Sequence, residues 1–138
     1  MIGRYDGVMN APPDEPYLYS AETFRIRGAL FEVYRTLGPG FLENVYEECL
    51  GLEFGAREIP FEAGRKLSLR YKGVLLRQGY VADFICFDQI LIELKAVRTI
   101  APEHRAQVIN YLRATEIRLG LLVNFGSSPK LEVERFAL

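Results

Sequence analysis

Three charged side chains interrupt an apolar stretch of the sequence, and their types and spacing suit metal chemistry. Residues 79–97 are rich in Val, Ile, Phe and Leu and contain a polar break at Asp88, which is typical of a β-hairpin. Asp83 lies in the first expected strand, and Glu93 and Lys95 lie in the second. A charge inside a buried strand is costly unless it is paired, hydrogen-bonded or bound to a metal. The stretch therefore predicts a site that compensates these three charges.

The length of the hairpin loop decides whether the two carboxylates can meet, because side chains alternate between the faces of a strand. A two-residue loop at 88–89 would place Asp83 opposite Leu94 and separate its carboxylate from that of Glu93. A three-residue loop at 87–89 would place Asp83 opposite Glu93. Paired Cβ atoms lie about 4.5–5.5 Å apart, which lets two carboxylates bind one hard cation such as Mg²⁺. A metal site therefore requires an odd-length loop or a bulge, and we predict one.

Composition limits the classes of function. The chain has 138 residues with 49% hydrophobic and 25% charged residues, which is ordinary for one globular domain. The formal net charge of −1 excludes a global basic field, so any contact with nucleic acid must be local. Two isolated cysteines, Cys49 and Cys86, predict free thiols. The sequence shows no signal peptide and no apolar run of membrane length, so we expect a cytoplasmic protein without a membrane partner.

The periodicity of the sequence predicts a mixed sheet flanked by helices. Residues 1–19 are rich in proline without periodicity and predict a flexible N-terminal arm, which leaves 20–138 as a single domain. The order of elements is α-α-β-β-β-α-β-β, which indicates an α/β or mixed α+β fold. Helices are expected over residues 20–37, 42–54 and 102–114, and strands over 61–62, 66–71, 74–76, the central hairpin, 120–125 and 131–136.

Two of the expected helices carry polar residues toward this hairpin. Glu43 and Glu47 lie four residues apart along the border of the second helix. His104, Gln107 and Tyr111 form one polar line on the third helix. Simpler interpretations are a solvated surface for Glu47 and a surface or capping role for His104, and the sequence leaves the roles of these two open.

Several motifs in the right order resemble a known protein family. Gly40, Glu43 and Tyr46 form a G-x-x-E-x-x-Y signature, and residues 71–74 and 92–97 resemble the same small bacterial GxxExxY proteins. That family is placed in the PD-(D/E)xK nuclease superfamily. Residues 107–111 also resemble the Q-x-x-x-Y motif of RecB-like nucleases. The resemblance covers the chain from about residue 20 to the C-terminus. One departure is Tyr34, where relatives commonly carry His.

The resemblance implies a restriction-endonuclease-like core and a set of site residues. Asp83 and Glu93 would bind Mg²⁺ or Mn²⁺, and Glu43 would add a direct or water-mediated contact. Lys95 would orient or deprotonate the attacking water and offset negative charge. Gln107 and Tyr111 would position the scissile phosphate or a nearby base. The simpler alternative is that Glu93 and Lys95 form a structural salt bridge.

The favoured function is therefore a divalent-metal-dependent nuclease that hydrolyses phosphodiester bonds, with DNA as the favoured nucleic-acid partner. The alternative is a catalytically inactive module of the same fold that binds nucleic acid or regulates another protein. The weak basic character favours this alternative, or a protein partner or homo-oligomer that supplies affinity for nucleic acid.

Overall fold

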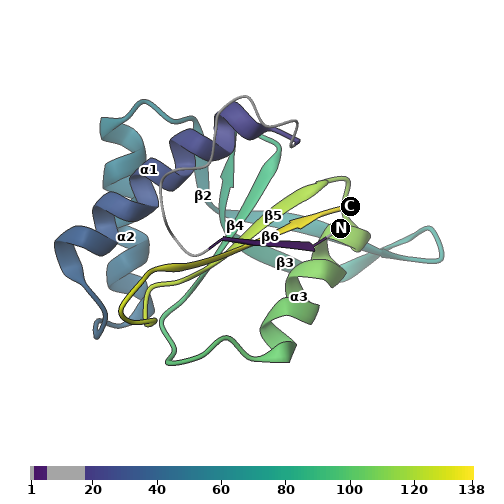
Figure 1. Ribbon diagram of the computed structural model, residues 1–138. Coiled ribbons are helices and arrows are strands. Elements are labelled where there is room, and N and C mark those ends of the chain that lie inside the picture. The colour runs from purple at the N-terminus through teal and green to yellow at the C-terminus, as the bar shows by residue number, and fades with distance from the viewer. Residues whose placement is uncertain (1, 6–17) are drawn as a thin grey trace.

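The structure, a computed structural model, describes residues 2–5 and 18–138. Its centre is a six-stranded mixed sheet in the order β1-β6-β5-β4-β3-β2 (Figure 1). Neighbouring strands are antiparallel except β4 and β5, which are parallel. The expected fold class is confirmed, and so is the order of elements from residue 20 onward. The helices are α1 Ser20–Leu37, α2 Glu43–Ala56 and α3 Pro102–Ala114, and the strands are β1 Ile2–Tyr5, β2 Phe61–Tyr71, β3 Val74–Cys86, β4 Ile90–Lys95, β5 Leu119–Asn124 and β6 Glu132–Ala137.

The helices cover the two faces of the sheet in separate layers, as Figure 1 shows. Helices α1 and α2 pack on one face, where Ile92 and Leu94 of β4 belong to their core. Helix α3 packs on the other face, where Leu91 of β4 contributes to a second core. Strand β4 is therefore buried on both sides, and a charge on it lies inside the protein.

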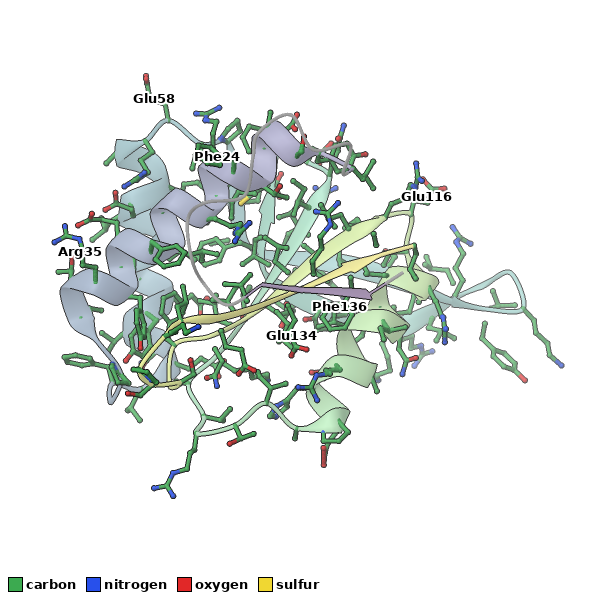
Figure 2. All side chains as sticks on the ribbon, viewed as in Figure 1. Phe24, Arg35, Glu58, Glu116, Glu134 and Phe136 are labelled. Carbon is green, nitrogen blue, oxygen red and sulfur yellow. The ribbon has the colours of Figure 1, made fainter. Side chains whose placement is uncertain are left out.

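Polar contacts fix α3 against the sheet. The Nε of Arg105 donates to both carboxylate oxygens of Glu134 on β6, at 2.9 and 3.0 Å. Figure 2 shows Glu134 and Phe136 together on β6, and Phe136 belongs to the core beneath α3. At the start of α3, the backbone N–H of Ala101 donates to Nδ1 of His104 at 3.0 Å. The capping interpretation of His104 is therefore confirmed.

Strands β2 and β3 form one long hairpin, where the sequence predicted several short strands. Backbone pairing runs from Phe61↔Cys86 to Tyr71↔Val74, with one irregularity between Ser68 and Arg70. The predicted turn at residues 72–73 is confirmed, and both residues have a positive φ, 48° and 82°, as a tight hairpin turn requires. The short segments merge because the backbone pairing of β2 with β3 continues on both sides of this irregularity. The turn projects away from the body of the protein, at the right of Figure 1.

The N-terminal arm predicted over residues 1–19 contains regular structure in its first part. Ile2–Tyr5 forms β1 and pairs with β6, so the absence of structure predicted for these residues is wrong. The physical reason is that β6 would otherwise be an edge strand with a row of unpaired N–H and C=O groups. Residues 6–17 lie outside the described part of the chain, and the boundary between arm and domain stays a prediction.

Candidate active site

The turn between β3 and β4 has the odd length that a carboxylate pair requires. The strands pair as Phe84↔Ile92 and Cys86↔Ile90, which leaves a three-residue loop at 87–89. Phe87 lies in the left-handed region with φ of 55°, and its N–H donates to the carbonyl of Pro60 at 2.9 Å. In this register Asp83 stands opposite Glu93, as predicted.

Asp83 and Glu93 bridge β3 and β4 at the point where the backbone ladder ends. The N–H of Asp83 donates to Oε1 of Glu93 at 3.1 Å, and the N–H of Leu94 donates to Oδ2 of Asp83 at 2.8 Å. Each carboxylate therefore replaces a missing backbone bond of the other strand. One oxygen of each carboxylate is used in this exchange, so the two side chains are oriented toward each other without a ligand.

A local rotation of β3 accompanies this arrangement. Tyr80 and Ala82 pack beneath α3, whereas Phe84 packs against α1 and α2. These three residues would share a face in a regular strand, so the alternation inverts at Asp83. On the neighbouring strand, Gly64 stands across from Asp83 outside the paired residues and has φ of +67°. The left-handed glycine lets β2 follow the rotation, because other residues adopt this conformation at a cost.

Burial perturbs both carboxyl groups. Glu93 is only 7% exposed, and burial, reinforced by the charge of Asp83, raises its pKa to about 8. Burial also raises the pKa of Asp83, against the opposing effects of the Leu94 N–H and the Lys95 ammonium. Two neighbouring carboxylates that resist ionisation are stabilised by a proton or by a cation. At neutral pH the pair therefore retains a proton that a metal ion can displace.

Glu43 and Glu47 extend the acidic cluster from α2. Burial raises the pKa of Glu43, and the charges of Lys95 and Asp83 act on it as well. The pKa of Glu47 is also raised, first by burial and then by Asp83 and Glu43. Both side chains are partly buried, so the solvated interpretation of Glu47 is not what the structure shows. The first turns of α2 therefore face the carboxylate pair.

Tyr46 fixes the position at which α2 begins. Its hydroxyl donates to the carbonyl of Gly38 at 2.6 Å and accepts the N–H of Phe41 at 3.1 Å. Its ring is fully buried and stacks on Phe125 with centroids 4.6 Å apart. The core-packing role predicted for Tyr46 is confirmed. The same residue also ties down the loop before α2, which sets where Glu43 lies.

Lys95 ends β4 beside a polar residue that the sequence analysis missed. Lys95 pairs with Asn124 of β5, which is fully buried. The Oδ1 of Asn124 accepts the N–H groups of Val97 and Gly126, each at 3.0 Å, while its Nδ2 has no hydrogen-bond partner among the described residues. Asn124 thus joins the two loops that follow β4 and β5. An amide within an apolar strand was the signal for it.

No direct ion pair joins Lys95 to Glu93 among the described residues. The structural salt bridge considered for this pair is therefore absent from the described part of the chain. The ammonium instead acts on Asp83, Glu93 and Glu43 through its charge. Lys95 is therefore available to interact with a phosphate or a water.

Tyr111 closes the site from the side of α3. Its ring stacks on that of Tyr80, with centroids 3.3 Å apart and an angle of 14° between the planes. Tyr80 is only 8% exposed, and its hydroxyl lies against Glu93 but makes no hydrogen bond of ordinary geometry in the described part. Tyr80 is a second residue that the sequence analysis missed. The stacked pair shields Glu93 from water.

Gln107 lies on the exposed surface of α3. It borders a hollow of about 440 Å³ together with Glu103, Asn110 and Tyr111. No hydrogen bond joins it to Asp83 or Glu93 within the described residues. The catalytic roles of Gln107 and Tyr111 stay predictions.

The donor set fits a hard divalent cation that keeps part of its water shell. In the described ranges, no three or more His, Cys, Asp or Glu side chains are gathered closely enough to hold a metal ion by themselves. Mg²⁺ commonly binds through one or two carboxylates and completes its shell with water and substrate phosphate. Asp83 and Glu93 supply such a pair, and Glu43 supplies a third carboxylate near Asp83.

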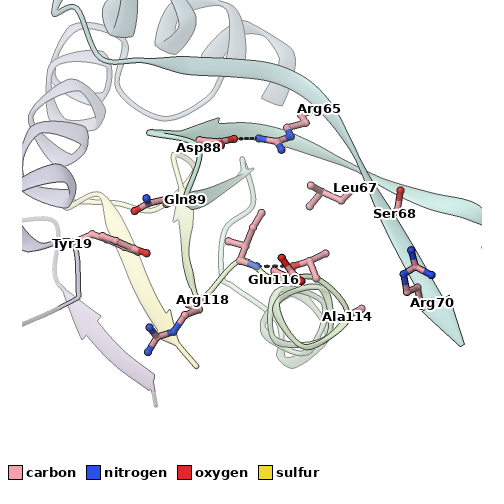
Figure 3. A pocket seen from close by; sticks show the side chains of 12 residues that line it. Tyr19, Arg65, Leu67, Ser68, Arg70, Asp88, Gln89, Ala114, Glu116 and Arg118 are labelled. Carbon is pink, nitrogen blue, oxygen red and sulfur yellow. Dashed lines mark hydrogen bonds and ion pairs between the residues drawn. The ribbon is translucent and has the colours of Figure 1, made fainter. Parts of the chain in front are cut away.

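A separate cavity of about 640 Å³ lies at the root of the β2–β3 hairpin and does not include these carboxylates. Arg65, Leu67 and Arg70 line one side, and residues 114–118, from the last residue of α3 onward, line another (Figure 3). Arg65 and Asp88 form an ion pair across its rim. The chemistry of the site therefore does not coincide with this cavity.

Comparisons with known proteins identify the family of this chain. No curated protein and no solved structure matches the chain significantly. No helix in the described ranges has both the length and the apolar character needed to span a membrane. A family profile described as the PD-(D/E)XK nuclease superfamily matches residues 20–136. This match covers strands β2 to β5, nearly all of β6, all three helices and the positions of Asp83, Glu93 and Lys95, and the chain belongs to the PD-(D/E)XK nuclease superfamily.

Proposed function

We propose that this protein is a divalent-metal-dependent nuclease that hydrolyses phosphodiester bonds in DNA. The observation that carries the proposal is the convergence of Asp83 and Glu93, each bonded to the other's strand in a buried place that raises both pKa values. Such a pair binds a hard cation more readily than it bears two charges alone. The superfamily match supports the same assignment.

Each residue has a defined role in this proposal. Asp83 and Glu93 hold Mg²⁺ or Mn²⁺, with Glu43 adding a direct or water-mediated contact. The bound metal supplies a Lewis acid that stabilises negative charge on the phosphoryl oxygens. Lys95 orients the attacking water or accepts its proton at Nζ, and offsets negative charge in the transition state. Tyr111 and Gln107 position the substrate backbone on the α3 side.

The contacts of Tyr46 offer a physical explanation for the narrower resemblance to GxxExxY proteins. The parts of the signature act together. The hydroxyl of Tyr46 is hydrogen-bonded to the glycine-containing loop, and this loop leads directly into Glu43. The departure at Tyr34 is also accommodated, since its hydroxyl donates to the carbonyl of Ser127 at 2.8 Å. We therefore assign the signature to positioning of the third carboxylate.

The alternative is a catalytically inactive nucleic-acid-binding or regulatory module of the same fold. It is favoured by the net charge of −1 and by the lack, in the described residues, of three gathered metal-binding side chains. A cleavage assay distinguishes the two functions. Single-stranded, double-stranded and branched DNA, and RNA, are incubated with Mg²⁺, Mn²⁺ or a chelator. Metal-dependent cleavage that is lost in Lys95→Ala supports the nuclease, whereas binding without cleavage by wild type supports the module.

A further inference from the structure

The β2–β3 hairpin is the most cationic segment that the proposed chemistry leaves unused. Between residues 63 and 82 the chain contains no Asp or Glu but carries five cationic residues, Arg65, Lys66, Arg70, Lys72 and Arg77. Arg65 is paired with Asp88. No carboxylate in the described part of the chain forms an ion pair with the other four. The hairpin therefore presents uncompensated positive charge on a protein whose net charge is −1.

One face of the hairpin is covered by the protein and the other is open. Leu67 and Tyr80 are paired across the strands and pack into the core beneath α3. Lys66 pairs with Val81 and therefore points to the opposite face. Val81 is 59% exposed on that face. The open face is thus free for a partner.

The open face combines cations with small and apolar side chains. Beyond the irregularity of the ladder, Arg70 pairs with Leu75, which is 56% exposed. The stem of Lys66 lies across Gly79, where a Cβ atom would come within 2.7 Å of the lysine Cε. A glycine at this position keeps the ribbon thin and leaves room for the lysine stem. Lys72 in the turn lies over the ring of Tyr71 at 5.4 Å.

The hairpin is continuous with the candidate active site. Strand β3 carries Asp83 at the level of Gly64 on β2, and the turn follows Tyr71. The seven residue-to-residue steps from Gly64 to Tyr71 extend roughly 24 Å at about 3.4 Å per step. Along one strand of B-form DNA this length corresponds to roughly seven nucleotides. A polyanion bound along the hairpin would therefore lead directly to the carboxylate pair.

We infer that the β2–β3 hairpin grips duplex DNA and lies in its major groove, next to the cleavage site. This inference rests on the proposed function, since it names the substrate class of the same site. The major groove of B-form DNA admits a two-stranded β-ribbon, whereas the deep, narrow major groove of duplex RNA does not. Lys66, Arg70, Lys72 and Arg77 contact phosphates, and Leu75 and Val81 contact the floor of the groove.

The test measures the salt dependence of DNA binding. Fluorescence anisotropy, in the presence of a chelator to prevent cleavage, gives the affinity for duplexes of about 24 base pairs, well beyond the roughly seven nucleotides that the hairpin spans. The test variant is Arg70→Gln/Lys72→Gln/Arg77→Gln. The charge-matched control is Arg25→Gln/Arg35→Gln/Arg57→Gln, which changes exposed arginines of α1 and the residue after α2. Lys72→Gln alone covers the case in which the triple hairpin variant does not fold.

The expected result is specific in size. Each lost phosphate contact lowers the slope of log affinity against log salt by about 0.9, so the hairpin variant loses about 2.7 and Lys72→Gln about 0.9. Between 200 and 50 mM salt, the ratio of wild-type to hairpin-variant affinity then grows roughly 40-fold. The control variant keeps the wild-type slope, and wild type prefers duplex DNA to duplex RNA and to single strands.

Other outcomes overturn the inference. These are equal losses in the hairpin and control variants, a preference for duplex RNA or single strands, binding only to anionic lipid vesicles, or hairpin-dependent self-association in sedimentation. The proposed nuclease function fails separately. Hairpin-dependent DNA binding without cleavage would support the role of the hairpin in DNA binding and refute catalysis. Cleavage by the hairpin variant with an unchanged KM and an unchanged salt dependence of binding would refute only the role of the hairpin in DNA binding.

Discussion

The ionisation of Glu93 makes the stability of the metal-free protein depend on pH in a defined direction. Its pKa is raised from 4.5 to about 8 by burial and by the charge of Asp83. The unfolded chain loses this proton near pH 4.5, whereas the folded chain keeps it until about pH 8. Within that window the folded state binds more protons than the unfolded state. The free energy of unfolding therefore falls as pH rises, and the contribution of Glu93 is fully favourable only below pH 4.5.

The size of the effect follows from the two pKa values of Glu93. One proton corresponds to about 1.4 kcal/mol per pH unit, so the interval from 4.5 to 8 corresponds to about 5 kcal/mol. Glu93→Gln keeps the shape of the side chain and removes its ionisation. The stability of this variant relative to wild type should therefore increase with pH, by an amount approaching about 5 kcal/mol at pH 9.

Urea unfolding at intervals from pH 4.5 to 9, with a chelator present, measures this difference. Glu58→Gln is the control, because it removes an exposed carboxylate beyond the end of α2. Its difference from wild type should stay within about 0.5 kcal/mol over the whole range. A difference between Glu93→Gln and wild type that does not change with pH would refute the buried carboxylate pair.

Three further substitutions test how the site is supported. Tyr46→Phe leaves a carbonyl and an N–H unpaired, so it should lower the free energy of unfolding in urea by about 1–3 kcal/mol and weaken Mn²⁺ binding. An unchanged affinity for Mn²⁺ would contradict the positioning role of Tyr46. Gly64→Ala should lower the free energy of unfolding by about 1–2 kcal/mol, because φ at this residue is +67°. The control Gly55→Ala lies in a helix and has equally open surroundings, so it should be neutral or stabilising by up to about 1 kcal/mol. Equal effects of the two substitutions would contradict the argument from backbone conformation. Tyr111→Ala should admit water to Glu93, lower its pKa and flatten the pH dependence of stability, whereas Tyr111→Phe keeps the stack, and equal slopes in the two variants would contradict shielding.

Local signals in the sequence were sufficient for the helices and the tight turn. The third helix was predicted over 102–114 because Pro102 favours a first helical position. The first helix ends before Gly38, which has φ of 67°, as the glycine-containing stop indicated. The turn at 72–73 was predicted from its lysine and glycine and is observed. These features depend on neighbouring residues and therefore appear in the sequence itself.

The carboxylate pair was partly predictable because side-chain alternation is strict. The alternation of side chains alone showed that Asp83 and Glu93 lie opposite each other only if the loop between their strands has an odd number of residues. The choice of that loop depends on a distant contact, since Phe87 donates its N–H to Pro60 of the segment before β2. Sequence reasoning therefore identified the condition for the site, and tertiary structure satisfies it.

The remaining features arise from packing between segments far apart in the chain. Strand β1 forms because β6 offers a free edge. Tyr80 matters through its stack with Tyr111, which lies on a different element. Asn124 joins two loops that meet only because β4 and β5 are parallel neighbours. Apart from the amide of Asn124 within an apolar strand, these relations have no local sequence pattern, so the sequence analysis missed them.

The most direct test of the central claim is the melting temperature of wild type, Asp83→Asn and Lys95→Ala with and without Mn²⁺. At about one hundred times its dissociation constant, a metal that binds only the folded state stabilises it by about 2.7 kcal/mol, or roughly 10 °C at about 4 °C per kcal/mol. Wild type and Lys95→Ala should show this rise. Asp83→Asn should show none, while melting without metal at the wild-type temperature or above it, because one of two repelling carboxylates is gone. A wild-type melting temperature that does not respond to Mn²⁺ or Mg²⁺ would contradict the assignment of Asp83 and Glu93 as a metal site.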